Sequence, residues 1–267
     1  MTSQPRLIDR ETSARTKPMR LLVLGLCRTG TSSMCAALEQ LGYTPHHMRS
    51  CMKNPQSLRY WSEAARIRYF DAPGAPYGRD EFDKLLGEHD AVTDCPSALF
   101  PTDLMRAYPE AKVILTLRPP HKWHASMLAT IWEAYTWRSM HILAYLDPAF
   151  AGINAVFMDL FFRQLCNRDP GQAMVDGYEK HNEEVRKAAK ELGREFLEYD
   201  VVQGWGPLVE FLEIEKPEGE FPNVNDSKHF IGTLRMMRNF RIMVVLGKAL
   251  VPAAVAGLAW WWLYKRR

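Results

Sequence analysis

Short apolar runs alternate with amphipathic segments along most of the chain. Short apolar runs predict strands at 20–26, 91–94, 111–118 and 194–200, and β-branched residues alternate with other apolar residues in 111–118. Helical patterns stand between them, in "TSSMCAALEQLG", "ALFPTDLMRAYP", "PPHKWHASMLATIWEAY" and "GPLVEFLEI", and over 153–167 and 172–191. This alternation favours an α/β fold, a three-layer parallel sheet with helices on both faces. Ligands of such folds bind beyond the carboxyl ends of the strands.

A much longer apolar stretch lies near the C-terminus. Residues 242–264 are 23 positions with one charge, Lys248. As a helix they span roughly 34 Å, enough to cross a hydrocarbon core of about 30 Å. Three tryptophans and a tyrosine within 260–264 resemble an interfacial aromatic belt, and three cations follow it. We therefore expect a transmembrane anchor at 242–264. A buried core helix and a helix lying in the membrane interface are the alternatives.

The remaining segments complete the expected domain organisation. Residues 1–18 are polar and contain no apolar signal region, so we expect a flexible arm, free or packed over the domain. The α/β domain takes 19–232. A basic juxtamembrane segment follows at 233–241, and its three arginines suit an anionic membrane surface. The expected location is an intracellular membrane, with the domain facing the cytosol.

Composition narrows the possible partners. A net charge of +3 over 267 residues gives no reason to expect a nucleic-acid partner. The five cysteines are odd in number and have no paired spacing, which indicates reduced thiols. No CxxC motif or Cys/His cluster stands in the sequence, so no metal is expected. Nothing in the sequence indicates an oligomeric state.

The segment "GLCRTGTSSM" at 25–34 carries the clearest chemical signal. Its two glycines have the spacing of a phosphate-binding loop, and it lies between a predicted strand and a predicted helix, where backbone N–H groups face an anion. Hydroxyl donors add to the loop: Thr29, Thr31, Ser32 and Ser33. A nucleotide-hydrolysing loop needs lysine where Thr31 stands, and here the cation is Arg28. This favours one terminal phosphate-like group over a triphosphate. A glycine turn without a ligand is the alternative.

Two motifs resemble the sulfotransferases that use 3′-phosphoadenosine 5′-phosphosulfate (PAPS). The loop is similar to their 5′-phosphosulfate loop. "VILTLRPPHKWHASM" is similar to their 3′-phosphate motif, in which an arginine ends a strand and a serine follows eight residues later, here Arg118 and Ser126. "EYDVVQGWGPLVEFLEIEKPEGEFPNVND" resembles the closing segment of a fungal sulfotransferase-like branch, so the likeness covers most of 19–228.

The resemblance implies roles for individual residues. Arg28 would stabilise the departing group, while Gly30, Thr31 and Ser32 would hold the 5′-phosphate. Arg118 and Ser126 would hold the 3′-phosphate.

The position of the base is implied by a second likeness. "TDCP" stands where family members carry a histidine base, so Asp94 would either take the acceptor proton or orient a neighbour such as Arg28. The other candidates for the base are His46, His47, His121 and His124, each expected to be structural or exposed.

The expected reaction is transfer of a sulfuryl group from PAPS to a hydroxyl of a small acceptor, lipophilic compounds included, with adenosine 3′,5′-bisphosphate (PAP) as product. A P-loop phosphotransferase is one alternative. The other is a non-catalytic, membrane-anchored relative that keeps the fold.

Overall fold

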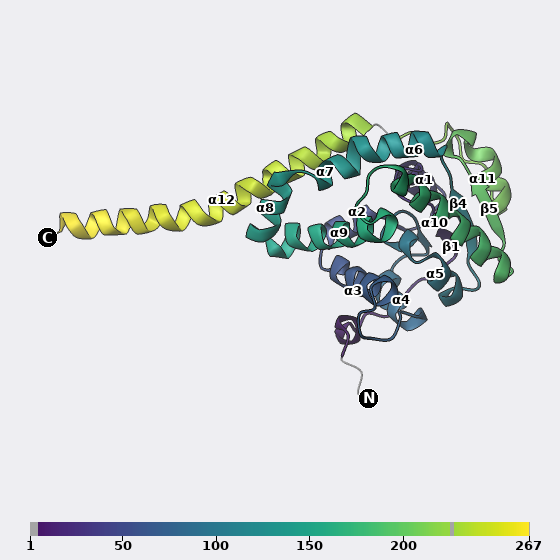
Figure 1. The fold of residues 1–267 in the computed structure, drawn as a ribbon, viewed down its shortest axis with the longest axis horizontal. Helices are drawn as coiled ribbons and strands as arrows, with labels where there is room; N and C mark the ends of the chain where they lie inside the picture. Colours follow the sequence, from purple (N-terminus) through teal and green to yellow (C-terminus); the bar gives the residue numbers. More distant parts are fainter. Residues whose placement is uncertain (1–4, 225–226, 267) are drawn as a thin grey trace.

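A single parallel sheet organises the molecule. In the computed structural model, which describes residues 5–224 and 227–266, five strands lie in the order β2-β3-β1-β4-β5, and all of their pairings are parallel (Figure 1). The strands are β1 (Leu21–Val23), β2 (Pro45–His46), β3 (Ala91–Val92), β4 (Lys112–Thr116) and β5 (Phe196–Tyr199). The parallel α/β architecture expected from the sequence is confirmed. The two-residue strand β2 was not predicted, because a pair that begins with proline has no apolar period to detect and suits only an edge strand.

Helices cover both faces of the sheet because successive strand residues point to opposite sides. Leu21 and Val23 of β1 pack on one side with α1 (Thr31–Gln40) and α11 (Trp205–Leu212). Leu22, between them, belongs to the larger core on the other side. The helices of that larger core are α3 (Ser57–Tyr69), α4 (Arg79–Leu86), α5 (Pro101–Ala107), α6 (Pro120–Met127), α9 (Ile153–Cys166) and α10 (Gln172–Glu191). The three layers follow from this alternation.

Shorter helices connect the main ones. The segment between α1 and β3 was left without predicted elements, yet it contains α2 (Met48–Lys53), α3 and α4 as well as β2. After α6, the helix continues through a π turn at Leu128–Trp132 into α7 (Glu133–Tyr135). The helix α8 (Arg138–Leu146) follows, and a second π turn at Pro148–Gly152 leads into α9.

The described part of the N-terminal arm packs over the domain. Ile8 is completely buried within the larger core. The backbone N–H groups of Leu7 and Ile8 donate to the carboxylate of Glu63, and Arg6 binds Glu81 at 2.5 Å. Of the two arrangements left open by the sequence, residues 5–18 adopt the packed one.

The C-terminal segment forms one continuous helix, α12 (Ser227–Lys265), which runs along the domain and then projects beyond it (Figure 1). Its arginines, expected to face lipid headgroups, instead bind the domain. Arg235 pairs with Glu133 at 2.8 Å, and Arg241 pairs with the buried Asp147. Arg238 lies over the ring of Trp137, 4.6 Å from its centroid. The first part of α12 is therefore docked, rather than a free juxtamembrane linker.

Beyond Arg241, Ile242, Val244 and Val245 are half-buried, and from Leu246 onward the described large apolar side chains of α12 are exposed, Leu250 and Leu258 among them. A buried core helix, one alternative for 242–264, does not fit these exposures. Within the described part of the chain, one helical stretch has the length and hydropathy of a membrane span, namely Pro148–Cys166. That stretch packs against α3 and is partly buried, as core helices of soluble proteins are.

The buried imidazole of His181 makes the stability of the fold depend on pH. Its Nε2 atom lies 2.8 Å from the carbonyl oxygen of Leu24, and burial lowers the pKa of His181 to about 4. The unfolded chain binds this proton near pH 6.5, so the native state is favoured above that pH and loses stability as pH falls toward 4. The loss for this group is about 3 kcal/mol.

We expect His181→Gln, which keeps an N–H donor, to make the pH dependence of urea unfolding shallower by about one proton between pH 6.5 and 4. Tryptophan fluorescence reports the transition. His121→Gln, at an exposed position, serves as the control. Identical slopes for the parent and His181→Gln would contradict the assignment.

Candidate active site

The phosphate-type loop follows β1 at the carboxyl edge of the sheet and leads directly into α1. The loop begins at Gly25, where the backbone passes so close to β4 that only glycine fits, because a Cβ atom on Gly25 would lie 1.9 Å from Oγ1 of Thr116. Gly30 caps α1 with φ of +94°, a conformation that glycine adopts without strain. The glycine spacing of the sequence therefore reflects two backbone requirements of this turn.

Several loop hydroxyls bond to the protein itself. Thr29 donates to the carbonyl of Leu26 at 2.7 Å and lies 2.7 Å from Oγ1 of Thr116. The Ser33 hydroxyl accepts from the backbone N–H of Val224 at 3.1 Å. Both side chains are buried, so in this structure they hold the loop rather than face a ligand. Ser32 is half-buried, and it stays a predicted phosphate contact.

The structure brings Arg28, Arg118 and Ser126 together. Arg28 Nε donates to Oγ of Ser126 at 3.1 Å, and Nη1 of Arg118 donates to the carbonyl oxygen of Arg28 at 3.2 Å. The Arg28 guanidinium also lies over the ring of Phe230 in α12, 4.8 Å from its centroid. Burial lowers the pKa of Arg28, although arginine stays charged at neutral pH. Two guanidinium groups and a hydroxyl thus converge on the loop, as an anionic ligand requires.

Two aromatic residues that the sequence did not single out hold this arrangement. Trp123 of α6 stacks on Tyr178 of α10, with ring centroids 4.2 Å apart. The Trp123 indole donates to the carbonyl of Cys27 at 2.9 Å. The Tyr178 hydroxyl donates to the carbonyl of Arg118 and accepts from its backbone N–H. No local sequence signal marks the pair, because Tyr178 lies 55 positions after Trp123 and both read as core positions of amphipathic helices.

A pocket of about 610 Å³ opens beside Arg118. Lys180 and Arg186 add positive charge to its wall, and Tyr178 and Pro119 add apolar surface. Acidic residues also line it: Glu179, Glu183 and Asp200. It lies where β4 ends, which is where ligands of parallel α/β folds bind.

Asp94 faces the loop from the turn after β3. Its Oδ1 accepts a hydrogen bond from the Thr31 hydroxyl at 3.3 Å, and its Oδ2 lies 3.4 Å from Nε2 of His47. Its φ of +69° is uncommon for a residue other than glycine and aims the carboxylate into the site. The sequence left two roles open for Asp94, a base and a group that orients a neighbour. This hydrogen bond shows that Asp94 orients Thr31.

His47, one of the histidines named as other candidates for the base, is buried and lies beside Asp94, a neighbour that the sequence did not predict. Its Nδ1 accepts from the backbone N–H of Arg49 at 3.1 Å, so in the neutral ring the proton is on Nε2, which makes no hydrogen bond to the described part of the chain although Asp94 Oδ2 lies 3.4 Å away. Burial lowers the pKa of His47, and the Asp94 charge partly opposes this effect. His46 is also buried, whereas His121 and His124 lie in α6.

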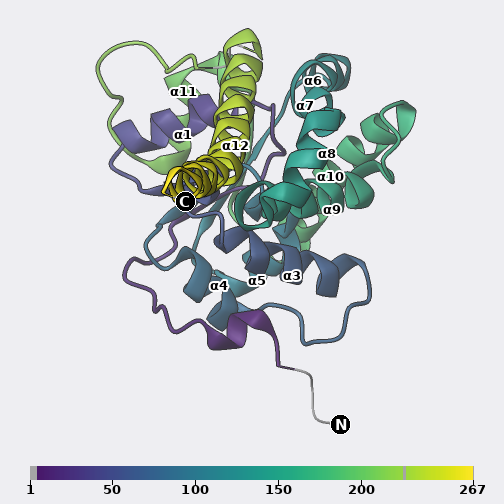
Figure 2. The same cartoon turned by 90° about the vertical axis from the view of Figure 1, so that its left-hand side faces the viewer.

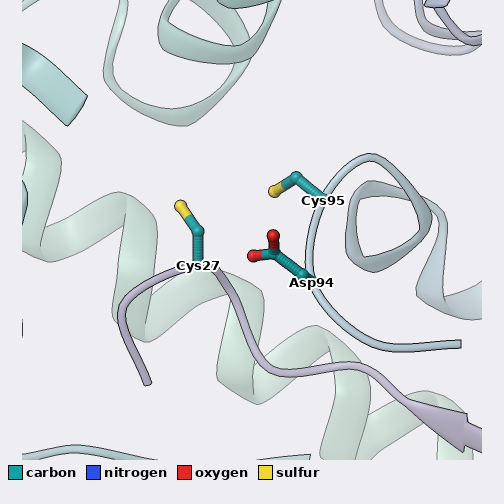
Figure 3. A group of neighbouring side chains, drawn as sticks. All are labelled: Cys27, Asp94 and Cys95. Carbon is teal, nitrogen blue, oxygen red and sulfur yellow. The ribbon is translucent and has the colours of Figure 1, made fainter. Parts of the chain in front are cut away.

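Figure 3 shows a cluster that the sequence gave no reason to expect. Cys27, Asp94 and Cys95 place their sulfur and oxygen atoms within 4.8 Å of one another, and all three are buried. These are ligand types that Zn²⁺ accepts, so this cluster is where a thiophilic cation would be held. The Cys27 thiol and burial together raise the pKa of Cys95 strongly, so Cys95 is a neutral thiol at pH 7. A metal would have to displace that proton.

The fold and the site define a parallel α/β protein with a glycine-bearing strand–helix loop, on which two arginines and a serine converge. Residues 20–230 match the family model described as "Sulfotransferase domain". The chain is also 35% identical over 260 residues to "Ava biosynthesis cluster protein M" of Aspergillus versicolor, which covers 93% of this chain and 98% of that relative. The protein belongs to the sulfotransferase-domain family, as the two sequence motifs indicated.

Proposed function

We propose that the protein is a PAPS-dependent sulfotransferase acting on a hydroxyl of a small acceptor. The observation that carries the proposal is the convergence of Arg28, Arg118 and Ser126 at the loop. A donor with both a 5′-phosphosulfate and a 3′-phosphate needs two anion sites. The loop with Arg28 supplies the first. Arg118, with Ser126, supplies the second, beside the pocket where β4 ends. The name of the relative from Aspergillus versicolor points to a biosynthetic cluster, which supports a small-molecule acceptor.

The residues at the loop suit an in-line transfer. The acceptor oxygen forms a bond to sulfur while the bond between sulfur and the bridging phosphate oxygen breaks. Arg28 neutralises the charge that develops on that leaving oxygen. Asp94 accepts the hydroxyl proton, and His47 holds the carboxylate in place from its Oδ2 side. His47 is thus a positioning residue, because its Nδ1 is bonded to the backbone of Arg49 and its Nε2 lies 3.4 Å from the carboxylate.

A phosphotransferase fits the site less well. The lysine that would reach the terminal phosphates of ATP is replaced by Thr31, whose side chain is buried and bonded to Asp94. The loop cation stands three positions earlier, at Arg28. A non-catalytic relative would keep PAP binding without turnover, so binding and turnover are tested separately.

Arg118→Ala should weaken the binding of PAP by about 10- to 150-fold, because one charge-assisted contact contributes about 1.5–3 kcal/mol. Binding of adenosine 5′-phosphate should change much less. Calorimetry on the full chain in detergent measures both affinities, and Arg79→Ala, an exposed arginine bound to Glu110, is the control. Equal losses for the two ligands would remove Arg118 from the 3′-phosphate site. Binding of ATP in preference to PAP would favour the phosphotransferase.

Asp94→Asn should lower turnover by about 10²–10⁴-fold, the usual contribution of a general base. PAP affinity should hold, because the asparagine oxygen can still accept from Thr31 and keep the loop in place. Rates are measured with [³⁵S]PAPS and a competent acceptor, and Asp103→Asn, which pairs with Arg68 elsewhere, is the control. Undiminished turnover would show that Asp94 is not the base.

We also propose that residues 242–264 anchor the enzyme in an intracellular membrane, with its domain in the cytosol. Support comes from the apolar length of the segment and its aromatic and cationic end. The exposure of its described large side chains adds to this, since water is a poor environment for such a surface. The continuous helix α12 would carry the docked domain at one end and the anchor at the other.

The full-length protein should remain in the membrane pellet after carbonate extraction at high pH. Leu250→Asp, Val255→Asp and Leu258→Asp together should release it, because each aspartate costs about 2.5–3.5 kcal/mol near the centre of a span. All three side chains are exposed, so the domain should stay folded. Extraction of the unaltered protein by carbonate would contradict the anchor.

A further inference from the structure

Large exposed apolar side chains concentrate on two helices of the described structure. Most of them lie on α12, and three lie on α8. On α8, Ile142 is 63% exposed, Tyr145 is 91% exposed and Leu146 is 60% exposed. The spacing of i, i+3 and i+4 places them on one face of that helix. Leu143, between them, is buried and fixes α8 against the domain. The face therefore belongs to a helix that is already packed on its other side.

This face lies at the end of the domain from which α12 departs. Figure 1 shows α8 beside the point where α12 leaves the domain. Figure 2 views the molecule from the side to which α12 projects, and α8 lies on this side of the domain. Arg241 fixes the relation, because it binds Asp147, the residue that follows α8, and lies over the ring of Phe150. The apolar stretch 242–264 begins at the next residue. The medium that surrounds the start of this stretch, lipid or water, therefore also borders α8.

A hollow with a strongly apolar wall accompanies the face. It measures about 450 Å³ and is lined by His141, Ile142, Tyr145 and Leu146. Its wall carries no carboxylate or ammonium group that would hold water or a charged partner. An apolar helical face with a tyrosine at its centre suits the boundary between headgroups and acyl chains.

We propose that Ile142, Tyr145 and Leu146 form a second membrane contact, which dips into the leaflet that α12 enters. This inference rests on the proposed anchor. The anchor tethers the chain, and the face on α8 holds the domain in one orientation against the bilayer. Because the π turn Leu128–Trp132 and α7 connect α8 to the helix bearing Ser126, the contact also sets how the candidate active site meets the membrane surface.

Site-specific labelling tests the proposal on the full chain. The five native cysteines are buried, so a new surface cysteine can be labelled selectively with an environment-sensitive nitrobenzoxadiazole dye. Tyr145→Cys reports the face, Leu258→Cys reports the anchor, and Leu192→Cys reports an exposed apolar site just after α10. Each labelled protein is reconstituted into phosphatidylcholine–phosphatidylserine vesicles with or without acyl-brominated lipid, which quenches dyes only at contact distance.

We expect brominated lipid to remove at least half of the fluorescence at 145 and at 258 and to leave 192 unchanged. Adding Ile142→Ser and Leu146→Ser should lower the quenching at 145 and keep it at 258. Quenching at 258 without quenching at 145 would overturn the second contact and leave the anchor standing. Quenching at none of the three positions would overturn the anchor and this proposal together. Equal quenching at all three would indicate non-specific adsorption and also overturn it.

Discussion

The stack of Trp123 on Tyr178 is the interaction on which the candidate site depends. Each ring carries a polar group that bonds to the backbone of one segment of the candidate site: the indole bonds to the loop at Cys27, and the phenol bonds to Arg118 after the end of β4. Because α6 and α10 each contribute one ring, the spacing between the loop and Arg118 is set by the packing of two helices. The convergence of Arg28 and Arg118 follows from that spacing.

The buried charged side chains of the site have interaction partners on several different elements. Arg28 is shared between the Ser126 hydroxyl and the aromatic face of Phe230, while Asp94 lies between Thr31 and His47. Burial lowers the pKa of Arg28 and also that of His47, so desolvation acts on both sides of the loop. Such buried polarity would suit the charged donor of the proposed function, because few of the dipoles in the site would have to reorient on binding.

The helix α12 joins three parts of the molecule that are distant in sequence. Its first turn brings Phe230 over Arg28, the following turns bind Glu133 and Asp147 through Arg235 and Arg241, and its remainder extends away from the domain. A rigid helix with these contacts relates the orientation of the C-terminal stretch to the position of the loop. Through α12 alone, the proposed membrane contacts would therefore fix the position of the candidate active site relative to the membrane.

The sequence by itself determined the parallel α/β fold, the glycine loop and the placement of Arg118 at the end of a strand with Ser126 in the next helix, since these depend on local period, glycine placement and short spacing. It also determined the family through the same two motifs. Only the tertiary structure decided which distant residues surround Asp94, because Thr31, His47 and Cys27 come from segments that meet it only when β1, β2 and β3 pair. The three arginines before the apolar stretch resembled a membrane-facing cluster in sequence. Their partners, Glu133 in α7 and Trp137 and Asp147 at the two ends of α8, come within reach only once this region packs against α12, since an ion pair is set by where two side chains meet in space and not by the charge pattern of one segment.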